Sequence, residues 1–204
     1  MADEVSAGNV DSVFHIGDIS YATRFLVEWD YFLHLITPVA SHVSYMTAIG
    51  NHERDYIGFG SVYVTPDSGG ECGVPYETYF QMPTPAKDKP WHRPMYSSIT
   101  GGILKSVDDD FVKAVEPLLL ANKVDLALWG HVHNYERTCA VYQKECKVLP
   151  TNGASGIDTY DHANYSASVH AVIGMAGFSL DQFPSQYVNA NSRKLEDSFQ
   201  ITRS

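Results

Sequence analysis

Four residues with metal-binding side chains come just after glycines that end short apolar runs. They are Asp18, Asn51 and the pair His131 and His133, which follow Gly17, Gly50 and Gly130. Their carboxylate, amide and imidazole donors have no thiolate nearby, so they favour iron, manganese, zinc or magnesium over a structural cysteine-type zinc site. Each residue alone would fit an ordinary turn. Their shared position after an apolar run favours a common metal site.

Two metal ions held by this donor set would act on phosphate. Asp18 can bridge two ions with its two oxygens, and a phenolate from Tyr21 could join if ferric iron lowers its pKa. His131 and His133 are two residues apart, so an extended backbone would point both toward one cluster. Two ions about 3.5–4 Å apart can clamp a phosphate ester and activate water. The pattern therefore favours phosphoester hydrolysis.

Three buried strands are expected to position these donors. Residues 13–16, 43–49 and 124–129 are short, partly β-branched apolar runs, each followed by a glycine and a polar ligand. With helices between them, they predict an α/β sheet with right-handed crossovers. Parallel strands end at one edge, where an α/β fold places its site.

Two amphipathic helices are expected between the strands. Residues 24–36 carry a one-sided apolar stripe, formed by Phe25, Trp29, Phe32, Leu33 and Ile36. The pattern Ser106-x-x-Asp109 predicts a capped start for the second helix, and Pro117 is expected to kink it near its end.

The second half of the chain has a different pattern. Residues 139–148 predict a hairpin, 169–175 a strand and 151–163 a polar loop, so we expect an antiparallel or mixed edge. The chain ends, residues 1–10 and 194–204, show no clear pattern.

The cysteines and one sequon indicate an oxidising, secretory environment. Cys139 and Cys146 are spaced to close the hairpin with a disulfide, which leaves Cys72 without an assigned partner. Asn164-Tyr165-Ser166 is a glycosylation sequon. The opening MADEVSAGNVDSVF has neither a basic leader nor an apolar signal core, so no secretion address is expected in the sequence as written.

Composition bounds the possible functions. The chain has 204 residues, of which 44% are hydrophobic and 19% charged, as expected for one globular domain. Its net charge of −10 opposes binding to a polyphosphate backbone, so a nucleic-acid partner is not expected. No apolar run is long enough to span a membrane. We expect a soluble protein whose partner is a small phosphate ester.

The ligand motifs resemble those of the purple acid phosphatases, in the metallophosphoesterase superfamily. The similar segments are Gly17-Asp18-Ile19-Ser20-Tyr21, Gly50-Asn51-His52-Glu53 and Gly130-His131-Val132-His133, with residues 67–76 and 92–96 similar to the large plant branch. The resemblance runs from about Gly8 to the C-terminus. It implies a calcineurin-like sandwich of sheets and helices.

The resemblance also implies a role for each site residue. Six residues would bind a ferric ion and a divalent zinc, iron or manganese ion: Asp18 as the bridge, Tyr21 and His133 on iron, and Asn51, His92 and His131 on the divalent ion. Asn51 and His52 would contact substrate, and His52 would hydrogen-bond the phosphate or protonate the leaving group. The parent family is secreted and hydrolyses phosphate monoesters, often at acidic pH.

This chain departs from the family pattern in three places. The first metal motif, Asp-x-Gly after an earlier strand, has no counterpart before Asp18, and we interpret Asp67-Ser68-Gly69 as a decoy. His92 follows the polar residues 86–91, so nothing aims it, and a central crossover near 91–92 is expected to be missing. The amino-terminal β-sandwich of the large plant enzymes is absent too. We therefore expect one incomplete metallophosphoesterase domain over residues 1–204.

Three functions remain open from the sequence. The first is an acid phosphatase with a dinuclear iron centre. The second is a nucleotide pyrophosphatase or phosphodiesterase, which would use the same ions with a different pocket. The third is a catalytically impaired truncated isoform without enzymatic activity, favoured by the missing carboxylate and by the position of His92.

Overall fold

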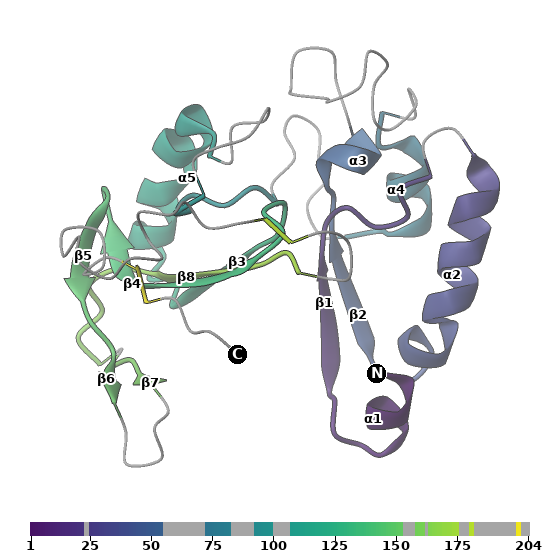
Figure 1. Cartoon of the computed structure of the whole chain (residues 1–204), viewed down its shortest axis with the longest axis horizontal. Helices are drawn as coiled ribbons and strands as arrows, with labels where there is room; N and C mark the ends of the chain where they lie inside the picture. Colours follow the sequence, from purple (N-terminus) through teal and green to yellow (C-terminus); the bar gives the residue numbers. More distant parts are fainter. Residues whose placement is uncertain are drawn as a thin grey trace. The chain divides into compact units, whose positions relative to one another are not determined.

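Two of the strands that precede ligand motifs pair in parallel (Figure 1). Strand β1 (Ser12–Ile16) lies beside β2 (Ser44–Ala48), with Phe14 opposite Met46. Helix α2 (Leu26–Ala40) connects them, as the sequence predicted. Parallel strands need such a crossover, and it brings the carboxyl ends of β1 and β2 to one edge.

The computed structural model describes residues 1–22, 25–54, 72–82, 92–99, 107–152, 158–161, 163–175, 180–181 and the backbone of 199–200. It divides into two compact units, Met1–His92 and Arg93–Ser204. The decoy motif Asp67-Ser68-Gly69, the polar residues 86–91 and Ser106 lie outside the described residues.

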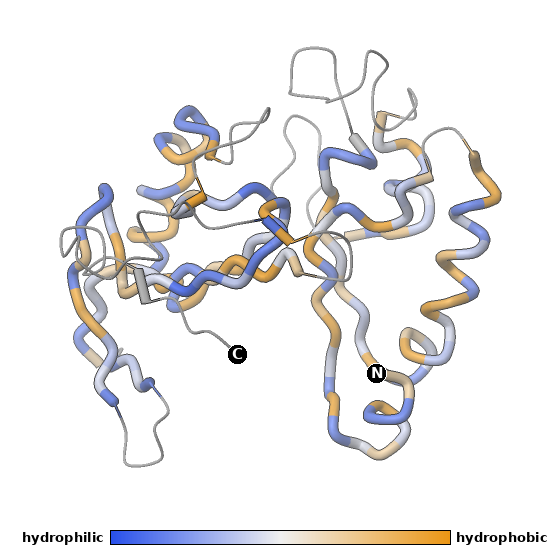
Figure 2. Tube along the Cα trace, in the orientation of Figure 1, coloured by the Kyte–Doolittle hydropathy of each residue, from blue (hydrophilic) through white to orange (hydrophobic). Residues whose placement is uncertain are grey.

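The core of the first unit forms around Trp29 of α2. Trp29 is fully buried and packs with Ile19, Ala22, Ile49 and Tyr76. Figure 2 shows apolar and polar residues alternating along α2, as an amphipathic helix requires. Phe25 was expected on the buried stripe, but it lies just before the helix and is exposed.

Among the described residues, the first unit also has three short helices. They are α1 (Ala2–Ser6), α3 (Asn51–Arg54) and α4 (Val74–Tyr79). Helix α1 forms in a segment that shows no clear sequence pattern. On α4, the hydroxyl of Tyr76 lies 3.0 Å from the hydroxyl of Thr47, which ties this helix to β2.

The second unit contains the predicted mixed sheet. Its strands are β3 (Leu126–Trp129), β4 (Tyr135–Tyr142), β5 (Glu145–Val148), β8 (Val169–Ile173) and β9 (Phe199–Gln200). Strand β8 pairs in parallel with β3 and antiparallel with β4, which also pairs antiparallel with β5 and β9. The hairpin β4–β5 and its Cys139–Cys146 disulfide confirm two predictions.

The α/β class is confirmed, but one expectation about the sheet is wrong. Among the described residues, β3 pairs with β8 in a separate sheet and not with β1 or β2. An apolar run identifies a buried strand without specifying its partner. Two two-residue strands, β6 (Thr151–Asn152) and β7 (Asp158–Thr159), form a small antiparallel pair within the polar loop.

Helix α5 (Asp109–Ala121) precedes β3 in the chain. Its N-cap is Asp108, whose carboxylate accepts hydrogen bonds from the backbone N–H groups of Asp110 and Phe111. The prediction of a Ser106 cap is therefore wrong. Phe111 is buried with its ring edge-on to Trp129, which joins the helix to the sheet. No helix in the described part of the chain is long and apolar enough to cross a membrane.

Candidate metal centre

The loop after β1 requires glycine at position 17. Gly17 has a φ of 73°, a left-handed conformation that side-chain-bearing residues seldom adopt. A Cβ atom placed there would lie 2.8 Å from Cγ of His92 and 2.9 Å from Cα of Gly50. Glycine therefore lets the imidazole of His92 and the loop after β2 approach the end of β1.

The loop after β2 likewise requires glycine, at position 50, because it packs closely against Asp18. A Cβ atom at Gly50 would overlap the backbone nitrogen and Oδ1 of Asp18. The two glycines thus allow two loops, 32 to 33 residues apart in sequence, to meet directly at the sheet edge. This is the physical reason for the glycines directly before Asp18 and Asn51.

Asp18 and His92 form the centre of this edge. Oδ2 of Asp18 lies 3.2 Å from Nε2 of His92, and the His92 side chain is fully buried. Burial alone would raise the pKa of Asp18, but the charge and hydrogen bond of His92, followed by those of His52, hold it well below its usual range. The expectation that nothing aims His92 is therefore wrong, because Gly17 and Asp18 fix its ring.

Tyr21, Asn51 and His52 lie around the same edge. The ring centroids of Tyr21 and His52 are 4.3 Å apart, and the backbone N–H of His52 donates a 3.1 Å hydrogen bond to Oδ1 of Asp18. Asn51 is buried and begins α3. All five site residues predicted in the first unit thus gather near the carboxyl ends of β1 and β2.

Glu53 is a buried carboxylate that the sequence analysis did not assign to the site. Its Oε1 accepts a 2.6 Å hydrogen bond from the backbone N–H of Ile19, and its Oε2 a 2.9 Å bond from that of Gly50. Burial, followed by the charge of Asp18, raises the pKa of Glu53 to about 8. Its position three residues after Gly50 was the one available signal, since a capping box has this spacing.

Three of the predicted ligands have an unusual backbone conformation. Asp18, Tyr21 and His131 have φ values of 51°, 51° and 66°, in the left-handed region. Residues with side chains rarely occupy this region, and those that do concentrate at functional sites.

In the second unit, His131 and His133 follow β3. Because His131 is left-handed, the pair does not lie in extended backbone, and the expectation based on strand alternation is wrong. The backbone N–H of His133 donates a 2.8 Å hydrogen bond to Oδ2 of Asp181. The side-chain amide of Asn134 donates a 3.1 Å bond to the Asp181 carbonyl, so this loop has anchors of its own.

The residues of the first unit suit a divalent or trivalent cation. Oδ2 of Asp18 and Nε2 of His92 are 3.2 Å apart, close enough for one ion to replace the hydrogen bond between them. Carboxylate, amide and imidazole donors are the ligands that iron, zinc and manganese accept. The backbone N–H of His52 also hydrogen-bonds Asp18, and contacts of this kind orient the ligands in metal sites.

A comparison with family models identifies this arrangement. Residues 1–135 match the model of the calcineurin-like phosphoesterases, which is well over half of the chain. The chain belongs to the calcineurin-like phosphoesterase family. The match covers both loops of the first unit and the segment that carries His131 and His133.

Known members of the family show the same relationship. The chain is 35% identical to the probable inactive purple acid phosphatase 27 of Arabidopsis thaliana, over 87% of this chain and 36% of the relative. It is 28% identical to a nucleotide pyrophosphatase/phosphodiesterase of Hordeum vulgare, over 96% of this chain and 73% of that protein. The chain thus spans about a third of the length of its Arabidopsis relative.

A solved structure agrees. A purple acid phosphatase from seeds of yellow lupin (Lupinus luteus) superposes with a TM-score of 0.61 and is 32% identical. The similarity covers 96% of this chain and 41% of the lupin chain. The resemblance to purple acid phosphatases is therefore confirmed.

Proposed function

We propose that this chain forms a metal-dependent phosphatase site that hydrolyses phosphate monoesters with a ferric ion and a divalent zinc, iron or manganese ion. The observation that carries the proposal is the pair formed by Asp18 and the buried His92, whose ligand atoms lie 3.2 Å apart at the edge where the loops of Gly17 and Gly50 meet. Family membership supports the reaction class.

The ligand assignment follows the family motifs. The proposed ligands are Asp18 as the bridge, Tyr21 and His133 on the ferric ion, and Asn51, His92 and His131 on the divalent ion. When bound, the two ions would supply Lewis acidity and the positive charge that a chain with a net charge of −10 lacks.

The chain's own groups would orient substrate and move a proton. Asn51 would direct its side-chain amide to the phosphate. The His52 imidazole, held against the Tyr21 ring, would hydrogen-bond a phosphate oxygen or donate a proton to the leaving-group oxygen.

Two other functions have specific support. The barley relative, which matches 96% of this chain, is named a nucleotide pyrophosphatase/phosphodiesterase. An impaired, non-enzymatic domain is supported by Arabidopsis relatives named probable inactive. Turnover of a phosphate monoester, a diester and a nucleotide by one preparation would distinguish these functions.

The decisive experiment is metal analysis with a visible spectrum, followed by turnover of p-nitrophenyl phosphate. Two ions per folded chain, a visible absorption band and turnover lost in Asp18→Ala support the proposal. Glu28→Gln, on the exposed side of α2, is the control for a changed carboxylate. Activity unchanged in Asp18→Ala would refute the assignment. Metal-free protein without turnover would favour the non-enzymatic alternative.

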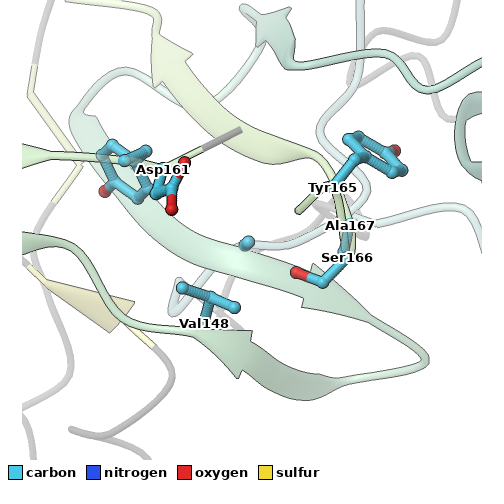
Figure 3. Close-up of a pocket in the computed structure, with 7 residues that line it drawn as sticks. Val148, Asp161, Tyr165, Ser166 and Ala167 are labelled. Carbon is cyan, nitrogen blue, oxygen red and sulfur yellow. The ribbon is translucent and has the colours of Figure 1, made fainter. Parts of the chain in front are cut away.

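We also propose a secreted, glycosylated protein. Asn164 is exposed in a turn, while the next residue, Tyr165, is anchored with its hydroxyl 3.3 Å from the carbonyl oxygens of Leu119 and Val124. Tyr165 and Ser166 also line a small hollow with Val148 (Figure 3). The disulfide fits an oxidising compartment. Secretion from a eukaryotic host should give a glycan-dependent mass shift that Asn164→Gln abolishes.

A further inference from the structure

Glu53 joins the two ligand loops of the first unit. Its side chain is 2% exposed, and each of its oxygens accepts a hydrogen bond from a different loop. Oε1 binds the backbone N–H of Ile19, directly after Asp18, and Oε2 binds that of Gly50, directly before Asn51. One side chain therefore contacts the neighbours of two proposed metal ligands.

Only part of this arrangement is a helix cap. Gly50 is the residue before α3 and Glu53 its third residue, so the bond from Gly50 to Oε2 is half of a capping box. The bond from Ile19 to Oε1 spans 34 residues and contributes nothing to the helix end. It connects the loop after β1 to the loop after β2.

Asp18 supplies the other half of the capping box from outside the helix. An N-cap side chain normally accepts from an N–H group in the first turn, but Gly50 has no side chain. Oδ1 of Asp18 takes that place and accepts from the N–H of His52. Each loop thus supplies a carboxylate that accepts a backbone hydrogen bond from the other loop. Oδ2 of Asp18 remains directed at His92.

We propose that Glu53 is a positioning residue for the metal centre, which holds the backbone on either side so that Asp18 and Asn51 present their donors together. The inference rests on the proposed function. Both hydrogen bonds lie in a buried site, and outer contacts of this kind change metal affinity by about 10–100-fold.

Zinc affinity of the folded chain tests the role of Glu53. Glu53→Gln keeps the volume but presents an amide N–H₂ group to one of the two backbone donors, so we expect zinc affinity to fall by about 10–100-fold. Glu28→Gln, which is exposed on α2, should bind zinc like the unchanged chain. Competition with a chromophoric chelator gives the affinity, and circular dichroism confirms folding.

A double-variant cycle separates positioning from general destabilisation. If Glu53 acts through Asp18, adding Glu53→Gln to Asp18→Asn should cost little further zinc affinity. The inference would be overturned if the two substitutions gave additive losses of zinc affinity. It would also be overturned if Glu53→Gln alone bound zinc within twofold of the unchanged chain. An unchanged chain that binds no zinc would refute the metal centre itself, and this role of Glu53 with it.

Hydrogen exchange keeps the test valid if Glu53→Gln does not fold. In the unchanged chain, the Ile19 amide should exchange slowly because Glu53 accepts its hydrogen in a buried site, and more slowly still with zinc. Fast exchange of the Ile19 amide both without and with zinc would contradict the proposed role of its hydrogen bond to Glu53.

Discussion

The indole N–H of Trp129 donates a 3.0 Å hydrogen bond to Nδ1 of His170, and the two rings stack at 12° with centroids 5.8 Å apart. Accepting this bond fixes His170 as the neutral tautomer protonated at Nε2. The contact lies at the end of β3, directly before the Gly130 motif. His170 is 1% exposed, and its burial lowers the pKa to about 4 from 6.5.

Folding should therefore weaken as pH falls from 6.5 toward 4. In this window the unfolded chain binds a proton at His170 that the folded chain excludes, so the contribution of His170 to the free energy of unfolding rises with pH and levels off above 6.5. The shift corresponds to about 3 kcal/mol. Urea unfolding from pH 4 to 7.5 should give a flatter profile for His170→Asn than for the unchanged chain. His34→Asn, exposed on α2, controls for loss of an imidazole. Equal slopes for His170→Asn and the unchanged chain would contradict the prediction.

Gly17→Ala should destabilise the chain more than Gly8→Ala. Both glycines have left-handed φ values, 73° and 75°, so both variants incur a backbone cost of about 1–2 kcal/mol. Only at Gly17 would the new Cβ also press on His92 and Gly50, since nothing lies within 4 Å of a Cβ at Gly8. We expect an added loss of about 1–3 kcal/mol from this overpacking. Urea midpoints of the two variants measure the difference, and equal losses would refute the contact.

Local sequence patterns predicted the features that depend on residues close together in the chain. Apolar runs located β1, β2 and β3, and the cysteine spacing located the hairpin disulfide, because each signal lies within a few residues. The N-cap of α5 was predicted at Ser106, but it is Asp108, two residues later and the first of three consecutive aspartates. Boundaries of this kind depend on one or two competing hydrogen bonds.

Contacts across long sequence separations could not be predicted in the same way. Glu53 is adjacent to a motif, but its role depends on Ile19, 34 residues earlier. His92 follows polar residues with no strand pattern, yet it is buried against Gly17, where a side chain would collide with its ring. The left-handed backbone of His131 has no sequence signal apart from its glycine neighbour, so the alternation rule failed there.

Breaking the Cys139–Cys146 disulfide should destabilise the second unit by about 2–3 kcal/mol. The bond closes a short loop within the β4–β5 hairpin, with the cysteines seven positions apart, and loop-closure entropy predicts this magnitude. Thermal unfolding of Cys139→Ser/Cys146→Ser against the unchanged chain measures it. Cys72→Ser, which removes the exposed free thiol, should leave the melting temperature unchanged. A melting temperature of the double variant equal to that of Cys72→Ser would contradict the prediction.

Metal binding should stabilise the chain only while Asp18 retains its carboxylate. A ligand that binds the folded state alone adds a free energy of RT ln(1 + [L]/Kd), about 2.7 kcal/mol at a hundredfold excess over Kd. Asp18→Asn keeps the shape and the acceptor for the His52 N–H, but it removes the negative charge that faces His92 and the proposed cation. Zinc should therefore raise the melting temperature of the unchanged chain and of Glu28→Gln, but not that of Asp18→Asn, and a chelator should reverse the rise. An equal rise in all three proteins would place the bound zinc elsewhere on the chain.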